Sequence, residues 1–496
     1  MQTIYDELRS LIRDLGKDGG QISPSVYDTA QVLRFAPPHE GVDAAFQWLL
    51  CQQKADGGWG DPHIPMARDV PTLAAILVMH HFQAHDLFFA KATEAGLSFL
   101  RQQAKQWQPP LSNDIPIGIE LILPRLLQDA RDVNLDVPHE CYFALKELGE
   151  RRKKLIAKTN PLAGTTPAHS WEAWGYSANQ SMLDETGGVG HSPAATANWI
   201  YLSKDDITLA EEREKAMSYL AAAAKATGFG IPGVVPTVWP IPGVEQAFGL
   251  YSLLITGLLD HPAVRDVVQA QLSVLTQEVG ANGFGISKHF SPDGDDTAVA
   301  LAVLSAANRP VNIRPLARFQ AEHYFYTYPN ELQYSLTATA HGIFALNQFG
   351  HCSESQQQFL MEQQQPDGRW AGEKWHASWL YPTLEIILAL LSTANKAVLR
   401  HTAAGLLAQQ RSDGGWGLNG KSTPTQTGYA LIALNALRRH GLVNGTTVNK
   451  MTMGHQWLLN NQHTTQADDE KYWIGKETYR EKRIDRIIEL VAILSG

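Results

Sequence analysis

The sequence predicts an all-α protein built as two α/α-barrel domains, with the active site in the cleft between them. Three observations lead to this prediction. Apolar residues recur at helical spacing, strand-like alternation is nearly absent, and a Gln-Gln…Asp-Gly-x-Trp motif occurs three times, each time after a helical segment. Repeats of this kind are typical of helix hairpins stacked around a ring or solenoid. With 496 residues, the chain is long enough for two or three domains.

The first helix is expected over residues 4–15, where apolar side chains fall on one face and Gly16 follows as a C-cap. Later apolar segments of helical length alternate with short turns rich in Gly, Pro and Asp. Clear examples are residues 42–53, 71–82, 116–130, 384–392 and 427–440. We expect these segments to form the helical barrels.

The repeated motif occupies residues 51–60, 362–370 and 408–417. We interpret each copy as a helix end, a glycine turn and a tryptophan that packs back onto the helix as a latch. The glutamine amide is expected to bond the free carbonyls at the end of its own helix. On this interpretation the three tryptophans are structural and not catalytic.

Connections rich in Pro and Gly occur at residues 109–116, 159–169 and 229–243. The last of them separates a first half with one copy of the repeat from a second half that holds two copies and a cluster of aspartates. It is therefore the best candidate for a domain boundary. A cleft between two domains is a common place for a ligand.

Composition excludes several classes of function. The net charge is -9 and is spread along the chain, which disfavours a nucleic-acid partner. The three cysteines lie far apart and form no CxxC pair, as expected for a reducing cytosol. The N-terminal segment has no signal-peptide pattern, and no apolar stretch is long enough to span a bilayer. We therefore expect a cytoplasmic protein without stable membrane insertion.

Three aspartates, Asp293, Asp295 and Asp296, open an almost wholly apolar helical run that ends at Leu304. Like charges and burial both raise the pKa of a carboxyl group, so such a cluster can keep one aspartic acid protonated near neutral pH. The alternatives are an N-cap that compensates the helix dipole, and a metal site. Spacing alone leaves all three open.

Aromatic residues outside the repeat gather in a few segments. These segments are residues 169–175, 236–240, 323–329 and 373–382. An acid that protonates an alkene needs a dry pocket, and the resulting carbocation needs aromatic walls that stabilise it by cation–π contact without reacting. Trp171, Trp239 and Trp375 are candidates to line such a substrate pocket, although any one of these segments on its own is also compatible with ordinary core packing.

The acid cluster reads Asp-Gly-Asp-Asp-Thr-Ala, which resembles the D-x-D-D-T-A motif of the class II diterpene cyclases. Other segments resemble signatures of that family and cover nearly the whole chain. They are SPSVYDTAQVLRF (23–35), PIGIELILPRLL (116–127), TTPAHSWEAWG (165–175), GHSPAATA (190–197), GVVPTVWP (233–240), EKWHASWLYPT (373–383) and YWIGKETY (472–479). Within the family, the sequence is most similar to the bacterial ent-copalyl diphosphate synthases of the gibberellin-pathway type.

The resemblance implies a βγ architecture of two α-barrels. Residues 1–20 would be the first helix of the β domain, residues 21–225 an inserted γ domain, and residues 226–496 the rest of the β domain with the acid motif. It also implies cyclisation of geranylgeranyl diphosphate, most simply to ent-copalyl diphosphate. Alternative products are another copalyl stereoisomer, a halimadienyl or kolavenyl diphosphate, and a hydroxylated diphosphate.

The same resemblance assigns roles to individual residues. Asp295 would be the general acid that protonates the terminal alkene, with Asp293 and Asp296 in support. The final deprotonation in this subgroup uses a water held by a His–Asn dyad. His169 matches the histidine, whereas the asparagine position is occupied by Thr237.

The diphosphate end of the substrate is expected to meet cations. Magnesium would be held by Asp114 and Glu120 or bound mainly by the diphosphate itself, and Lys154 and Lys476 are the lysines expected near the diphosphate. The chain has no complete D-D-x-x-D motif of the kind that class I terpene synthases use to ionise a diphosphate. The product should therefore keep its diphosphate and pass to a class I diterpene synthase.

Two readings from other classes compete with this one. A helical-barrel glycosidase also combines carboxylates with tryptophans, but it places two acids in separate roles across an open cleft. A helical repeat scaffold without enzymatic activity would use the aspartates only as a cap. Turnover of geranylgeranyl diphosphate separates both from a cyclase.

Overall fold

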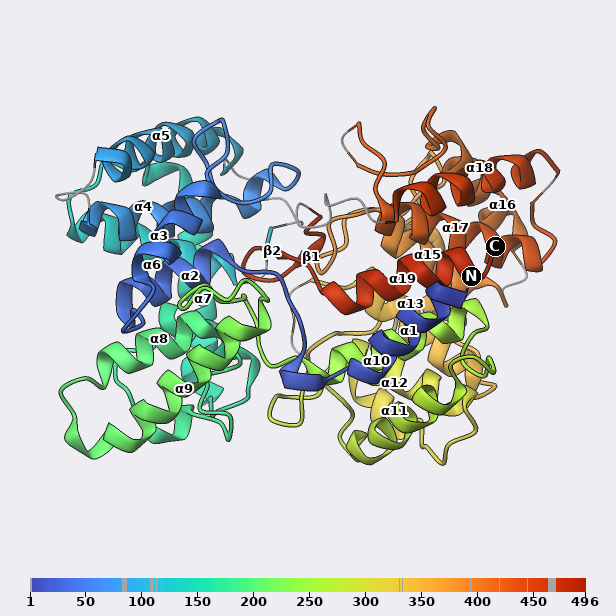
Figure 1. Cartoon of the computed structure of the whole chain (residues 1–496), viewed down its shortest axis with the longest axis horizontal. Helices are drawn as coiled ribbons and strands as arrows, with labels where there is room; N and C mark the ends of the chain where they lie inside the picture. The colour runs from blue at the N-terminus through green and yellow to red at the C-terminus, as the bar shows by residue number, and fades with distance from the viewer. Residues whose placement is uncertain are drawn as a thin grey trace.

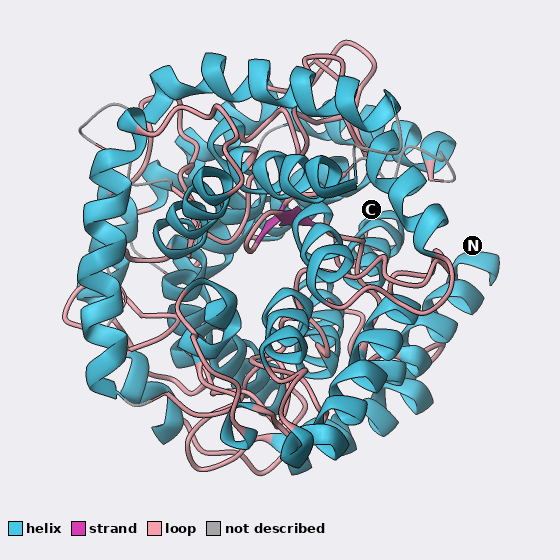
Figure 2. Cartoon of the chain, turned by 90° about the vertical axis from the view of Figure 1, so that its left-hand side faces the viewer, coloured by secondary structure: helices cyan, strands magenta, loops and turns pink. Residues whose placement is uncertain are grey.

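The computed structural model describes residues 2–496 except 83–86, 108–110, 112–114, 117, 160, 330, 332, 393–394, 419, 444 and 463–469. The described chain is mostly helical and includes one short two-stranded sheet, so the predicted all-α class is confirmed. Helices α2 (Val26–Phe35) to α9 (Ala210–Ala226) form one group, and α1 (Gln2–Asp14) joins α10 (Pro242–Thr256) to α19 (Lys482–Leu494) in a second (Figure 1). Seen from the first group, helices run around the centre of the molecule, and the two strands lie near the middle (Figure 2).

The remaining helices of the first group are α3 (Val42–Cys51), α4 (Asp69–Phe82), α5 (Leu87–Gln103), α6 (Ile119–Asp132), α7 (Phe143–Thr159) and α8 (Pro193–Leu202). Those of the second are α11 (Arg265–Glu278), α12 (Gly294–Ala306), α13 (Leu336–Gln348), α14 (Glu354–Glu362), α15 (Leu380–Leu390), α16 (Lys396–Ala408), α17 (Pro424–Arg439) and α18 (Gly445–Asn461). No helix within the described residues is long and apolar enough to cross a membrane.

Each group of helices has its own apolar core. In the second group, Leu8 and Ile12 of α1 are fully buried in one core with side chains of α10 to α19. In the first group, two other cores are built from side chains between Val26 and Val235. The first helix of the chain thus packs with α10 and the helices that follow it, although residues 15–241 separate α1 from α10. The domain boundaries at residues 20/21 and 225/226 remain predictions.

The strands β1 (Trp473–Ile474) and β2 (Thr478–Tyr479) form an antiparallel hairpin that lies between the two groups (Figure 1). On one side, the backbone N–H of Ile474 donates to the carbonyl of Trp375 at 2.8 Å. On the other side, Glu477 Oε1 accepts from the backbone N–H of Val26, the first residue of α2, at 2.7 Å. The hairpin therefore ties the N-terminus of a first-group helix to a loop of the second group.

The three copies of the repeated motif share one geometry, and the predicted latch is confirmed. Trp59, Trp370 and Trp416 are fully buried, and each indole Nε1 donates to the backbone carbonyl ten residues earlier, at 2.8, 2.7 and 2.8 Å. The expected role of the glutamine was wrong. The amide of Gln53, for example, donates to the carbonyl of Gly57 in the turn and to that of Ala92 on the next helix, because the tight turn brings both within reach.

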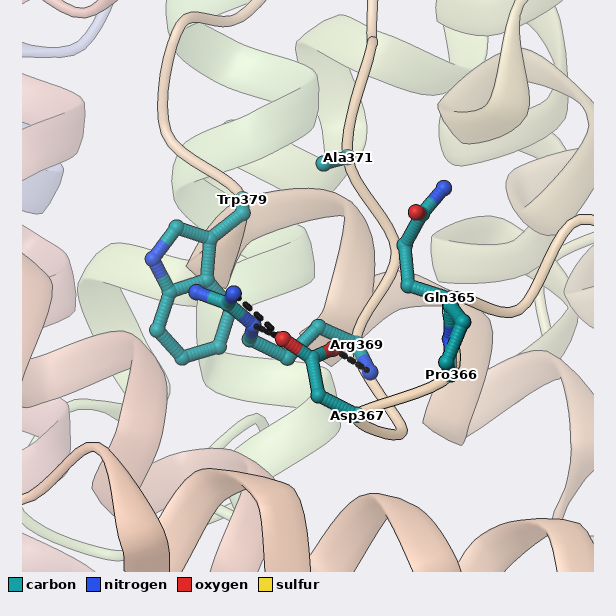
Figure 3. A pocket seen from close by; sticks show the side chains of 6 residues that line it. All are labelled: Gln365, Pro366, Asp367, Arg369, Ala371 and Trp379. Atoms are coloured by element: carbon teal, nitrogen blue, oxygen red, sulfur yellow. Dashed lines mark hydrogen bonds and ion pairs between the residues drawn. The ribbon is translucent and has the colours of Figure 1, made fainter.

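A surface hollow lies beside the second copy of the motif (Figure 3). The guanidinium of Arg369 lies over the ring of Trp379, 4.7 Å from its centroid. Its Nε donates to the carboxylate of Asp367. The charged groups of this hollow therefore satisfy one another, and we assign it a role in closing the turn.

We predict that Trp416→Phe destabilises the fold without changing what the protein does. The change leaves the carbonyl of Leu406 without its indole donor and removes buried ring volume, so stability should fall by about 1–3 kcal/mol. A denaturant midpoint that moves down, with no change in reaction product, is the expected result. Tyr176→Phe is the matched control because Tyr176 is 77% exposed. A Trp416→Phe midpoint equal to that of the control would contradict the latch.

Candidate active site

The acid motif begins α12, and its first aspartate is a helix cap. Asp293 has an extended backbone, and its Oδ1 accepts from the backbone N–H of Asp296 at 2.8 Å. A Cβ added to Gly294 would lie 2.1 Å from the carbonyl oxygen of Tyr326, so only glycine fits between the two carboxyl-bearing positions. The capping alternative is therefore correct for Asp293. The cap does not use the side chains of the other two aspartates.

The two outer aspartates are almost fully buried. Burial raises the pKa of Asp296 to about 8, and burial together with the charge of Asp296 raises the pKa of Asp293 well above its ordinary value. Burial therefore disfavours the charged form of both carboxyl groups, and Asp296 keeps its proton at neutral pH. As a result, the cluster does not place three negative charges at one helix end.

Asp295, the middle aspartate, has a different partner. Its Oδ1 lies 2.6 Å from Nδ1 of His341 on α13. Nε2 of the same imidazole lies 3.1 Å from Oε2 of Glu385 on α15, which is an ion-pair distance without the alignment of a linear hydrogen bond. The hydroxyl of Tyr251 on α10 donates to that Glu385 oxygen at 2.7 Å. Four helices of the second group thus meet at one buried chain of polar groups.

The charges of His341 and its carboxylate partners explain why these polar groups are stable away from water. Burial by itself lowers the pKa of His341, but the carboxylates of Asp295 and Glu385 outweigh it and raise that pKa to about 10. His341 is therefore an imidazolium at neutral pH, and its Nδ1–H donates to Oδ1 of Asp295. This bond occupies Oδ1 of Asp295 and leaves Oδ2 available to a substrate; when Asp295 is uncharged, Glu385 still compensates the imidazolium.

Aromatic rings surround the imidazolium. The ring centroids of Phe248, Tyr251 and Tyr381 lie 5.7, 5.2 and 6.4 Å from that of His341. Trp473 of the hairpin extends this wall, 6.0 Å from Phe248 and 5.3 Å from Tyr381. The faces of these rings are suited to stabilise a cation that has no nucleophile beside it.

The tryptophans expected to line the pocket have separate surroundings. Trp375 donates from Nε1 to Oγ1 of Thr327 at 2.8 Å and belongs to the loop that pairs with the hairpin. Trp239 packs against Tyr219, with 5.4 Å between ring centroids, and Trp171 is buried in an apolar core of the first group. Their role as substrate contacts remains a prediction.

His169 and Thr237 both lie near the turn of the hairpin. Nδ1–H of His169 donates to the carbonyl of Gly190 at 2.9 Å, which leaves Nε2 with the lone pair. Burial, with the charge of Lys476 added, lowers the pKa of His169 to about 3, so the ring is a neutral base. The hydroxyl of Thr237 is fully buried without a hydrogen-bond partner among the described residues, and a Cβ on Gly475 would lie 3.7 Å from it. A bound water is the natural partner for such a hydroxyl.

The two lysines expected near the diphosphate differ in environment. Lys476 is buried, and its ammonium donates to Glu172 Oε1 at 2.6 Å and to Ser192 Oγ at 2.5 Å, with Asp28 Oδ1 at 3.7 Å. In this state its charge is compensated inside the protein. Lys154 is exposed on α7. Contact of either lysine with a diphosphate remains a prediction.

The expected magnesium ligands are only partly within the described chain. Asp114 lies outside the described residues. Glu120 is buried, and its Oε1 accepts from Nε of Arg152 at 3.2 Å. Within the described ranges, no group of three or more His, Cys, Asp or Glu side chains is placed to hold a metal ion. Magnesium binding by Asp114 and Glu120, or by the diphosphate itself, therefore remains a prediction.

Sequence reasoning missed His341, Glu385 and Tyr251. A signal was available, because His341 is the only ionisable residue of α13 and Glu385 the only charged residue of α15. A lone ionisable group in a helix that is otherwise apolar must find a partner when it is buried. The identity of that partner follows only from the packing of α12, α13 and α15.

Comparisons with known proteins agree with this geometry. Residues 336–481 match the squalene-hopene cyclase C-terminal domain family. The chain is 41% identical to (+)-kolavenyl diphosphate synthase of Herpetosiphon aurantiacus, over 99% of this chain and 97% of that protein. It is 31% identical to an ent-copalyl diphosphate synthase of a Streptomyces species, over 88% of this chain and 84% of that one. The structure of ent-copalyl diphosphate synthase from Streptomyces platensis aligns with a TM-score of 0.83 at 27% identity, covering 100% of this chain and 99% of that one. This chain belongs to the class II diterpene cyclases.

Proposed function

We propose that the protein cyclises geranylgeranyl diphosphate to a bicyclic diterpene diphosphate, and that Asp295 starts the reaction by protonating the terminal alkene. The observation that carries this proposal is the contact between Asp295, at the start of α12, and the buried imidazolium of His341 on α13. The substrate follows from the diphosphate products named for the related synthases.

The proposed steps use groups described above. The proton on Oδ2 of Asp295 goes to the terminal alkene carbon, and the alkene electrons form the new C–H bond. The next two double bonds attack in turn, which closes two rings and leaves a tertiary cation. The imidazolium of His341 stabilises the carboxylate left on Asp295, and Asp296, which keeps its proton at neutral pH, adds no repulsion.

The reaction ends when a neighbouring proton leaves the cation. A water held by Nε2 of His169 and the hydroxyl of Thr237 would accept it, because both groups are uncharged and Thr237 is fully buried. The diphosphate takes no part in these steps, so it stays on the product. Transfer of that product to a class I diterpene synthase is part of the proposal.

For the carbon skeleton we favour a rearranged, kolavenyl-type product. Identity to the kolavenyl synthase is 41%, against 31% to the ent-copalyl synthase. Thr237 supports the same choice, because one hydroxyl orients a water less firmly than an amide with both donor and acceptor. A less firmly held base gives hydride and methyl shifts time to occur. The second candidate is ent-copalyl diphosphate, favoured by the overall likeness to the Streptomyces platensis enzyme, and only this product would support a gibberellin pathway.

The test is incubation of purified protein with geranylgeranyl diphosphate, with products measured intact and again after phosphatase treatment. A bicyclic diphosphate is expected, and comparison of the alcohol with kolavenol and copalol standards identifies the skeleton. Release of a free hydrocarbon or of inorganic pyrophosphate would contradict the proposal, as would unchanged substrate.

Asp295→Asn should abolish cyclisation and leave the fold intact. The amide keeps the size of the side chain but cannot donate a proton to an alkene, so the rate should fall by at least ~10²–10⁴-fold. Asp205→Asn, at an exposed acid, is the matched control and should keep the wild-type rate. A near wild-type rate for Asp295→Asn with an unchanged circular dichroism spectrum would rule out the assignment.

Activity should fall as pH rises through about 8, where Asp296 loses its proton and adds a negative charge beside Asp295. The same shift affects stability. Asp296 in the folded protein keeps its proton at pH values where the unfolded chain has lost it, so its contribution to stability should decline from about pH 4 to about pH 8. Asp296→Asn cannot ionise and should flatten both profiles in these ranges. Profiles identical to the wild type would assign the alkaline loss to another group.

A further inference from the structure

The loop that leads into the acid motif is anchored at its tip by the first group of helices. At its base, the backbone N–H of Asp293 donates to the carbonyl of Phe284 at 3.0 Å. At its tip, Oγ of Ser287 lies 2.6 Å from Nε2 of His191. His191 immediately precedes Ser192, the cap of α8, and has no catalytic role in the proposed reaction.

His191 combines full burial with an unusual backbone conformation. Its side chain is fully buried, and its φ of 55° is in the left-handed region that non-glycine residues seldom adopt. Its Nδ1 lies 3.0 Å from Oδ2 of Asp184, whose side chain is also buried. Its ring lies 5.2 Å from that of Phe290, which belongs to the same loop as Ser287. A strained backbone and a buried polar contact at one residue indicate a position that the fold holds tightly.

The backbone carbonyls of residues 190 and 191 accept hydrogen bonds from the two segments that contain His169 and Thr237. The carbonyl of Gly190 accepts from Nδ1–H of His169 and so sets the direction of the Nε2 lone pair. The carbonyl of His191 accepts from the backbone N–H of Trp239 at 3.0 Å, two residues after Thr237. One dipeptide therefore contacts both segments that carry the proposed water ligands.

We propose that His191 is a positioning residue that fixes the proton-donating end of the site relative to its proton-accepting end, and so determines which proton leaves the cation. The side chain holds the loop before Asp295 through Ser287, while the adjoining backbone holds His169 and the Thr237 segment. This inference rests on the proposed function. If the link is cut, the remaining bonds from the backbone N–H and the hydroxyl of Ser291 to the carbonyl of Gly164 hold the two ends less firmly, and the held water reaches other protons or the cation itself.

Two substitutions at position 191 form a matched pair. His191→Gln places an amide nitrogen near the position of Nε2 and keeps the bond to Ser287. His191→Asn is polar and tolerates the left-handed backbone, but its shorter amide corresponds to Nδ1 and does not reach Ser287. Ser287→Ala cuts the same link from the other side and leaves His191 in place.

The readout is the ratio of the main product to all other cyclised diphosphates, measured with the thermal midpoint of each variant. We expect His191→Asn and Ser287→Ala each to lower this ratio on the order of 10-fold, since small misplacements in an active site have effects of that size or larger. The double variant should be no worse than either single one, and His191→Gln should keep the wild-type ratio. Trp416→Phe, which destabilises the fold away from the site, should leave the ratio unchanged.

An unchanged ratio in both His191→Asn and Ser287→Ala, with only a lower rate or midpoint, would overturn the inference and leave the proposed function standing. If His191→Asn does not fold, Ser287→Ala decides the matter alone. A wild-type protein that forms no cyclised product would overturn the proposed function and this inference together.

Discussion

The contact between Asp295 and His341 is the interaction on which the rest of the site depends. A buried imidazolium alone would be costly, whereas the contact with Asp295 and the carboxylate of Glu385 stabilise its charge away from water. Burial of the pair requires α12, α13 and α15 to pack closely, which the apolar character of these helices permits. The positive end of the α12 dipole also favours the negative charge that Asp295 bears once its proton has gone. The acid and its support therefore come from fold elements that also build the core.

The first group of helices contributes the other half of the site through polar contacts. The hairpin turn brings Lys476 to Glu172, and burial together with the charge of Lys476 keeps the ring of His169 neutral. A neutral base separated from the acid is what the chemistry needs, because a charged base beside the acid would take its proton before the alkene did. In the proposed reaction, proton donor and proton acceptor thus lie on different groups of helices, and the loops between them set their distance.

Local sequence was enough to predict the helices, the tryptophan latches and the acid motif. These features depend on spacing along a few turns. Spacing alone left the function of the Asp-Gly-Asp-Asp segment open, and the assignment of Asp295 as the acid came from the family resemblance. The partners of these groups could not be predicted in the same way. His341 lies 46 residues from Asp295, and Glu172 lies 304 residues from Lys476, so only tertiary packing brings them together. The product skeleton is harder still, because it depends on how a flexible chain folds against the aromatic wall.

The protonation state of His341 tests the central claim most directly. It can be read from ¹⁵N chemical shifts of the histidine ring nitrogens in labelled protein, with His341→Gln used to assign the signal. The account predicts an imidazolium with both nitrogens protonated at about pH 8, where an ordinary histidine is neutral. A His341 ring that is neutral at that pH and titrates near the ordinary value of about 6.5 would contradict it.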